Sequence, residues 1–282
     1  MRAWKLLRRD VTAWAGGILL LLLLLAALGA GWSGDPTVGA LEERLQPPSW
    51  QHPFGTDHQG RDVLVRSLHG ARISLGIGVG ARVVSVLLGG VLGLWAGFRG
   101  GWVDAWIMRL ADVFFAFPSL LLLIGITAAF DPGLWLVFIA LGVVGWAEVA
   151  RLVRSEALRV REQEFVSAAR ALGMRPGRIL WRHVAPNCLN PILVSFTMGV
   201  ATTILAEASL SFLGLGAQPP TPSWGAMVSA GKEYLPTAPW VSVFPGLMLA
   251  AAVLSLNLLG DAVRDAQDPR AVRSAPSQGE AS

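Results

Sequence analysis

The residues of this chain with the greatest capacity for chemistry are five charged side chains inside long apolar segments. They are Arg82, Arg109, Asp112, Glu148 and Glu207. A charge at membrane depth is costly, so such residues usually face a polar cavity or pair with an opposite charge. These side chains are therefore candidates for a solute path, for contacts between helices or for contacts with a partner subunit.

Two of the five are the strongest candidates for a path. Glu207 lies beside Ser209 and Ser211 in the middle to outer part of its apolar segment. We expect it to line the translocation path or a subunit interface. Arg82 lies well inside its own segment, too deep to reach water unless the membrane span begins late. We expect Arg82 to contact Glu207 or a partner subunit.

The remaining charges and two prolines have more local explanations. Arg109 and Asp112 are three residues apart, so they share a helix face and are expected to neutralise each other. Glu148 lies near the inner end of its segment, where we expect it at the membrane interface. Pro118 and Pro191 each remove a helical hydrogen bond; such breaks either bend helices around a pathway or serve as packing kinks. Of the two, Pro118 is the candidate pathway residue.

The polar residues outside the apolar segments predict neither an enzyme nor a metal site. The motifs HExxH and GxSxG are absent, and no histidine lies in an apolar segment. His52, His58 and His69 share one polar segment, but spacings of six and eleven residues match no metal-ligand motif. The single cysteine, Cys188, excludes an intramolecular disulfide and a multi-cysteine metal site.

The composition places these residues in a membrane protein. Of the 282 residues, 53% are hydrophobic and 15% are charged, whereas soluble domains carry about 25% charged residues. A membrane-spanning helix needs about 20 mostly apolar residues. Six segments qualify: 13–31, 73–98, 106–130, 133–150, 190–213 and 240–260. The sequence predicts an all-α, polytopic helix bundle with six transmembrane helices and excludes a nucleic-acid-binding protein.

The second apolar segment carries closely spaced glycines between Gly76 and Gly97. Small residues let helices approach closely in lipid, so these glycines predict packed helix faces. They do not form a phosphate-binding loop, because no Lys-Ser/Thr pair follows them and no strand pattern flanks them.

The basic residues predict the orientation. Loops on the cytoplasmic side of a membrane carry an excess of lysine and arginine. With the N-terminus inside, the inner segments hold 16 of these residues and the outer segments hold 5. Both termini are therefore expected in the cytoplasm. A cleaved signal peptide is the alternative for the first apolar segment, but that segment is long enough to span and five more follow.

One inner segment, 151–187, is too long and polar for a simple turn. Its second part begins as a short helix at Glu164 and stops at Gly173, a residue type that commonly ends helices. Pro176 begins a second short helix, 177–184, which Pro186 is expected to end. A short helix outside the membrane either connects two spans or presents a knob to a groove in another protein.

The residues of this loop resemble the EAA loop of ABC importer permeases. The family pattern is Glu-Ala-Ala-x-x-x-Gly, then nine residues, then Ile-x-Leu-Pro. This chain has Ser167-Ala168-Ala169-x-x-x-Gly173, then nine residues, then His183-Val184-Ala185-Pro186. Ser167, His183 and Ala185 depart from the pattern. The resemblance assigns ATPase docking to Ser167, Ala168, Ala169, Gly173 and Pro186, with shape rather than a carboxylate as the basis of docking.

Further segments resemble the dipeptide/oligopeptide/nickel permease group, and most closely its second, C-type permease. They are 54–62, 97–104, 116–119, 205–216, 219–225 and 257–261, so the resemblance extends from about residue 50 to 270. It implies three units: a tail, first helix and outer loop in 1–71; a five-helix permease domain in 72–270 with the EAA loop at 164–187; and a disordered cytoplasmic tail in 271–282.

The resemblance implies a permease in the plasma (inner) membrane of a prokaryote that hydrolyses nothing and binds no cofactor. Its implied partners are the lipid bilayer, a homologous second permease, two ATPase subunits that carry ATP and Mg²⁺, and an extracytoplasmic binding protein. Peptides are the favoured cargo, with nickel, glutathione or another small solute as alternatives. A secondary transporter driven by an ion gradient is a further alternative, although the internal repeats common in that class are not evident.

Overall fold

The structure is a computed structural model that describes residues 11–267. Two expectations lie outside the described residues. One is the basic start of the chain, with Arg2, Lys5, Arg8 and Arg9. The other is the tail 271–282, together with Arg270 just before it.

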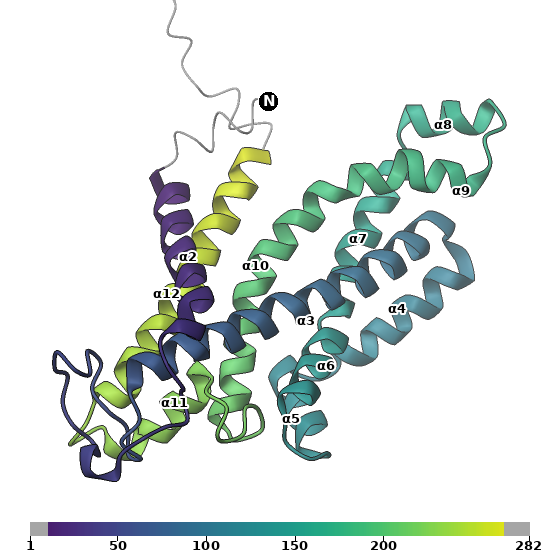
Figure 1. Cartoon of the computed structure of the whole chain (residues 1–282). Helices are drawn as coiled ribbons and strands as arrows, with labels where there is room; N and C mark the ends of the chain where they lie inside the picture. Colours follow the sequence, from purple (N-terminus) through teal and green to yellow (C-terminus); the bar gives the residue numbers. More distant parts are fainter. Residues whose placement is uncertain (1–10, 268–282) are drawn as a thin grey trace, which may run out of the picture.

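The described chain is helical, and it contains only isolated β-bridges in place of strands. Its long helices are α2 (Val11–Gly29), α3 (Val63–Arg99), α4 (Gly101–Phe115), α5 (Ser119–Ala128), α6 (Leu134–Val144), α7 (Trp146–Arg161), α10 (Ala185–Phe212) and α12 (Trp240–Gln267). Its short helices are η1 (Ala30–Trp32), η2 (Leu41–Glu43), α8 (Glu164–Ala171), α9 (Pro176–Ile179), the π-helical turn η3 (Leu180–Val184), α11 (Trp224–Gly231) and η4 (Lys232–Tyr234). The predicted all-α class is confirmed (Figure 1).

Within residues 11–267, five helices are long and apolar enough to cross a membrane, and a sixth crossing is made if α4 and α5 are counted as one broken span. The predicted third span, 106–130, is therefore wrong as a single helix, because α4 and α5 meet at a bend of 83°. The cause is Pro118, which precedes α5 with an extended backbone and disfavours helix in the residue before it. The other five spans are confirmed, although the helices extend beyond the predicted limits.

Glycines join α3 to α7 in a close seam. A Cβ atom on Gly93 would lie 2.5 Å from the carbonyl oxygen of Ala150, and one on Gly97 would lie 2.6 Å from that of Arg154. The same packing holds at Gly89, whereas Gly76 and Gly90 have open space where a Cβ would be. The expected packed glycine faces are thus confirmed, against α7 and also at Gly78 against Ile204 of α10 and at Gly80 against Phe138 of α6.

Ion pairs link α4 to α7 beside this seam. Arg151 donates to Asp112 over 2.7 Å, and Arg154 forms a two-pronged contact with Asp104, in which Nη2 is 2.6 Å from Oδ2. The expected pair between Arg109 and Asp112 is therefore wrong. The two residues share a helix, but α7 brings a different guanidinium to Asp112, and Arg151 also lies 4.0 Å from the ring centre of Phe115.

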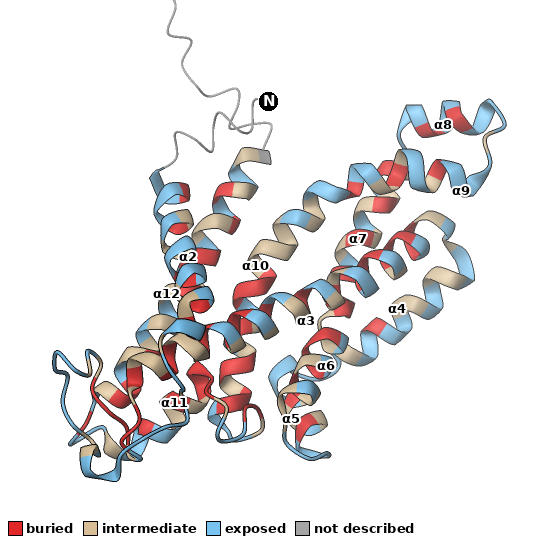
Figure 2. Ribbon diagram, viewed as in Figure 1, coloured by how far each residue is buried: buried red, intermediate tan, exposed pale blue. Residues whose placement is uncertain are grey.

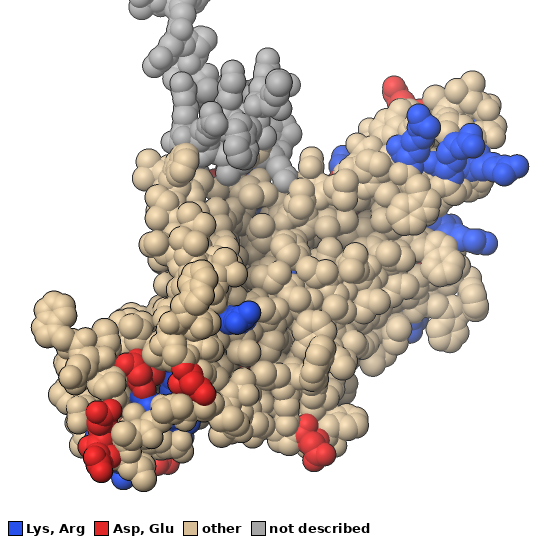
Figure 3. Space-filling view, viewed as in Figure 1, with Lys and Arg blue, Asp and Glu red and all other residues tan. Residues whose placement is uncertain are grey.

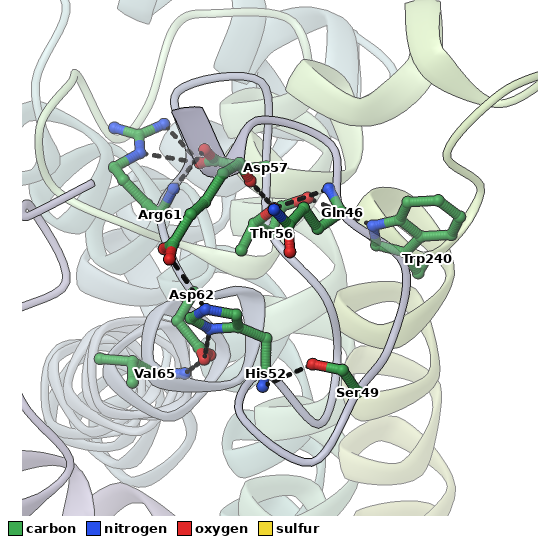
Figure 4. Close-up of polar contacts among 10 residues, drawn as sticks. Gln46, Ser49, His52, Thr56, Asp57, Arg61, Asp62, Val65 and Trp240 are labelled. Carbon is green, nitrogen blue, oxygen red and sulfur yellow. Dashed lines mark hydrogen bonds and ion pairs between the residues drawn. The ribbon is translucent and has the colours of Figure 1, made fainter. Parts of the chain in front are cut away.

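The polar segment between α2 and α3 folds into a compact cap over the end of the bundle where α3 begins. In Figure 4, Arg61 contacts Asp57 at 2.7 Å, and His52 contacts Asp62 at 2.8 Å. Asp62 also caps the first turn of α3 through the backbone N–H of Val65. The Trp240 indole donates to the carbonyl oxygen of Thr56, so the cap is fastened to the start of α12.

The other two histidines of this region have separate contacts. His58 stacks on Tyr234, and burial lowers the pKa of its imidazole. The Nδ1 atom of His69 lies 3.0 Å from the carbonyl oxygen of Val65, one helical turn earlier. The three histidines therefore serve different local contacts, and within residues 11–267 no cluster of three or more potential ligands could hold a metal ion.

Candidate functional site

Helix α8 projects from one end of the bundle, beyond α7 and α10 (Figure 1). It ends in a hydrogen-bonded cap in which the Met174 N–H bonds the Ala169 oxygen and the Gly173 N–H bonds the Arg170 oxygen. Gly173 has a φ of +75°, the left-handed conformation that this cap requires and that glycine adopts without strain. The predicted end of the helix at Gly173 is confirmed.

Helix α8 has an inner and an outer face. Val166 and Ala169 are buried and pack, with Ile179 and Val184, against α7. Ser167 and Ala168 are exposed, and Leu172 is 83% exposed on the outer side. The interpretation that both alanines face a partner is therefore wrong for Ala169, because its methyl group contributes to the packing that holds α8 on the bundle.

The connection from α8 back into the bundle also differs from expectation. Pro186 does not end a separate helix, because residues Pro176 to Phe212 form one continuous helical span. Pro186 lies in the first turn of α10 and follows the π-helical turn η3, so it falls where the regular α-helical hydrogen bonding is already interrupted. Pro191 is likewise accommodated inside α10 and does not break it.

The end of the molecule that carries α8 is basic. Figure 3 shows lysine and arginine side chains gathered over α8 and α9, and acidic side chains gathered over the cap at the opposite end. The exposed arginines of this region are Arg170, Arg175, Arg178 and Arg182. Apolar side chains accompany them, since Phe165 is 44% and Trp181 is 63% exposed.

A cavity of about 760 Å³ lies between α10 and the helices α3, α5, α6 and α7. Its walls are mostly apolar, and its polar lining residues are Arg82, Ser119, Glu148, Ser195, Thr202 and Thr203. Arg82 was predicted as a path residue and does line this space. Pro118 is not part of the lining, but it positions its neighbour Ser119, which is.

Arg82 is held in place by α10 rather than by Glu207. Its Nη2 atom donates to the carbonyl oxygen and the hydroxyl oxygen of Ser195, both at 2.7 Å, and Nη1 lies 3.7 Å from Glu148. The expected contact with Glu207 is therefore wrong. Arg82 meets α10 at Ser195 and Gly199, and Glu207 lies eight residues beyond Gly199, about 12 Å further along the helix axis.

Glu207 is fully enclosed by the chain itself. One carboxylate oxygen accepts from Ser211 at 2.7 Å and the other accepts from Ser74 at 3.0 Å. Ser74 in turn lies 3.4 Å from the N–H of Trp224, the first residue of α11. With an exposed fraction of 0%, Glu207 lines neither the cavity nor the outer surface of this chain; it joins α10, α3 and α11. Figure 2 shows this junction as a buried region.

Replacing Glu207 by leucine should destabilise the chain far more than replacing it by glutamine. Leucine leaves the hydroxyls of Ser74 and Ser211 without their acceptor, at about 1–3 kcal/mol for each unsatisfied group. Glutamine retains one oxygen and adds a donor, so one serine keeps its bond. The measurement is the thermal unfolding midpoint of the purified complex. Equal midpoints for the leucine variant and the unmodified chain would show that this junction does not support the fold.

Sequence reasoning undervalued two residues of the cavity. Glu148 was assigned to the membrane interface, although its charge inside an apolar segment was the signal for a cavity residue. Gly199 carried no signal at all, because only the structure shows that Arg82 occupies the space a side chain there would need.

These features define a class of protein. Five or six apolar crossings, a cavity that holds an arginine and a carboxylate, and a short helix that projects beyond the crossings are the parts of a membrane transport subunit that works with a partner. Comparison with known proteins narrows the class to a family.

The family model of the binding-protein-dependent transport system inner membrane component matches residues 89–273. A second model, the N-terminal TM domain of oligopeptide transport permease C, matches residues 1–48. This chain belongs to the family of binding-protein-dependent transport system inner membrane components. It is a multi-pass inner-membrane permease subunit of an ABC importer, and it is not an enzyme, since permeases of this family leave ATP hydrolysis to separate subunits.

Curated relatives cover nearly the whole chain. The dipeptide transport system permease protein DppC of Alkalihalophilus pseudofirmus is 43% identical over 95% of this chain and 89% of the relative. The oligopeptide transport system permease protein OppC of Bacillus subtilis is 41% identical over 93% of this chain and 87% of the relative. The glutathione transport system permease protein GsiD of Escherichia coli is 43% identical over 95% of this chain and 89% of the relative.

A solved structure shares the fold. A chain of the MetNI methionine ABC transporter, in an inward facing conformation, superposes with a TM-score of 0.58 at 19% sequence identity. The match covers 73% of this chain and 97% of that chain. It confirms the arrangement of helices as that of an ABC importer permease.

Proposed function

We propose that this chain forms half of the solute path of a peptide importer. The chain would pair with a homologous permease, above two ATPase subunits that hold ATP and Mg²⁺ and below an extracytoplasmic binding protein. The observation that carries this proposal is the similarity along the whole chain to permeases named for dipeptides, oligopeptides and glutathione, all of them peptides.

Helix α8 is the proposed contact with the ATPase. Its outer side offers small side chains at Ser167 and Ala168 beside the apolar Leu172, a shape that fits a groove. Ala169 and Gly173 support the contact indirectly, through the packing and the turn that hold α8 in place. Pro186, in the first turn of α10, directs the chain from the loop back into the bundle.

The proposed orientation places α8 and both termini in the cytoplasm. The first residues of α2 and the last residues of α12 lie at the same end of the bundle as α8 (Figure 1). That end also carries the basic surface over α8 and α9, as the positive-inside rule requires of a cytoplasmic face. The polar cap between α2 and α3 would then face the binding protein.

Reconstitution into liposomes tests the function. The chain is purified with its partner permease, ATPases and binding protein, and uptake of radiolabelled Ala-Gln-Ala is measured with ATP inside the vesicles. We expect uptake that requires both ATP and the binding protein. Uptake of nickel in preference to the peptide would overturn the assignment of cargo. Uptake by this chain alone, driven by a proton gradient without ATP, would overturn the assignment to an ABC importer.

A further inference from the structure

The cavity contains one acidic and one basic side chain, and they differ sharply in access to its space. The Glu148 side chain is 69% exposed, whereas that of Arg82 is 3% exposed. A ligand that enters the cavity therefore meets the carboxylate of Glu148, while the guanidinium of Arg82 lies behind it in the wall.

The recess that holds Arg82 is built by α10. A Cβ atom on residue 199 would fall on the guanidinium, so the glycine there leaves the space that Arg82 fills. Both bonds from Nη2 go to Ser195 on the same helix. Arg82 thus has strong fixed partners that are not Glu148.

The pairing between Arg82 and Glu148 is loose. The distance from Nη1 to Oε2 is 3.7 Å, beyond the 2.7–2.9 Å of a charge-assisted hydrogen bond. Among the described residues this is the only ion pair of Glu148. A guanidinium nitrogen at 3.7 Å takes up little of the acceptor capacity of the carboxylate, so both oxygens remain available to a donor in the cavity.

Within residues 11–267, the rest of the lining carries no second negative charge. Its other side chains are mostly apolar, and its remaining polar groups besides Arg82 are the neutral hydroxyls of serine and threonine. Within the described cavity lining, Glu148 is therefore the one group that attracts a cation through opposite charge.

We propose that Glu148 binds the cationic group of the transported solute, an alkylammonium supplied by a peptide N-terminus or by a lysine side chain. Arg82 is a positioning residue, whose fixed guanidinium lies 3.7 Å behind the Glu148 carboxylate in the cavity wall. The identity of the solute as a peptide rests on the proposed function, but the site for an alkylammonium does not.

A labelling experiment on the purified complex tests the site without transport. Thr202, which lines the cavity and is exposed, is changed to cysteine in a Cys188→Ala background, and its reaction rate with N-ethylmaleimide is measured on this subunit. The probes are N-acetyl-lysinamide and the neutral N-acetyl-norleucinamide. We expect the cation to slow labelling about threefold at twice its dissociation constant. The neutral probe should have no such effect.

The variants make the result specific. Glu148→Gln should remove the difference between the two probes, and Asp112→Asn should preserve it. Asp112 is the matched control because it is also exposed and paired with an arginine but is not part of the cavity lining. The proposal is overturned if both probes give equal labelling rates in the Thr202→Cys protein that retains Glu148. A cation of a partner subunit that already occupies Glu148 would produce this result. A protection that survives in Glu148→Gln also overturns the proposal.

Uptake then identifies the source of the ammonium. We expect Glu148→Gln to lower uptake of Ala-Gln-Ala about tenfold, the effect of one charge-assisted hydrogen bond, and to leave the small uptake of N-acetyl-Ala-Gln-Ala unchanged. A loss confined to Ala-Lys-Ala would assign the site to lysine side chains instead. If the unmodified importer carried none of these peptides, the proposed function would fail while the labelling result still decided the site.

Discussion

A valine at Gly173 should lower both the ATPase activity stimulated by the binding protein and peptide uptake, while the chain still folds and inserts. Gly173 has a φ of +75°, and a β-branched residue is strongly disfavoured there. The cost of the left-handed conformation for an L-residue is about 1–2 kcal/mol, which lowers the population of the α8 cap by a factor of roughly 5–30. A Cβ at this position has no atom of residues 11–267 within 4 Å apart from its chain neighbours, so the damage is confined to the turn that orients α8.

The measurement is the ATPase activity stimulated by the binding protein, together with peptide uptake, in reconstituted vesicles. We expect both to fall about tenfold in Gly173→Val. Gly173→Asn is the matched control, because asparagine tolerates the left-handed conformation and should retain most of the activity. Normal stimulation in the valine variant, with the complex intact, would show that the geometry of α8 does not carry the coupling.

A valine at Gly93 should have a large effect on the fold. Its Cβ would lie 2.5 Å from the Ala150 oxygen and 3.0 Å from the Cβ of Val153, and neither the α7 backbone nor a Cβ can rotate away. Helices α3 and α7 would have to separate along the seam that also includes Gly89 and Gly97. Overpacking of this kind costs about 1–3 kcal/mol and sometimes more. A backbone clash at the centre of the seam belongs at the upper end of that range.

The control lies three residues away on the same helix. A Cβ on Gly90 has no atom within 4 Å, so Gly90→Val adds the same methyl groups without a clash inside this chain. We expect the Gly93 variant to accumulate several-fold less in the membrane and to unfold at a lower temperature than the Gly90 variant. The reverse order would mean that the seam tolerates separation and that the face of α3 around Gly90 is packed in the assembled transporter.

Features that depend on composition along one helix were predictable. The apolar segments located the crossings, because the length of a spanning helix is set by the thickness of the bilayer. Gly173 was predictable as a helix end, because the need for a left-handed residue is local to that turn. The spacing of alanine, glycine and proline in the loop 164–187 predicted the family of ABC importer permeases without knowledge of any contact between helices.

Contacts between helices were not predictable in the same way. Asp112 shares a helix with Arg109, yet it pairs with Arg151. Ala168 and Ala169 are neighbours of the same residue type in the loop motif, yet Ala168 is exposed and Ala169 is buried against α7. In both cases the partner comes from another helix, and its rotation and tilt decide which side chain it meets.

The sequence by itself determined that this chain is a helical membrane permease, because hydropathy, helix-ending residues and the loop motif are properties of single segments. The tertiary structure alone decided the chemistry within the membrane. It enclosed Glu207 among serines, set Arg82 into the space beside Gly199, and left Glu148 facing the cavity. The physical reason is that each of these charges needs a partner in a medium without water, and only the packing of whole helices determines which partner lies within reach.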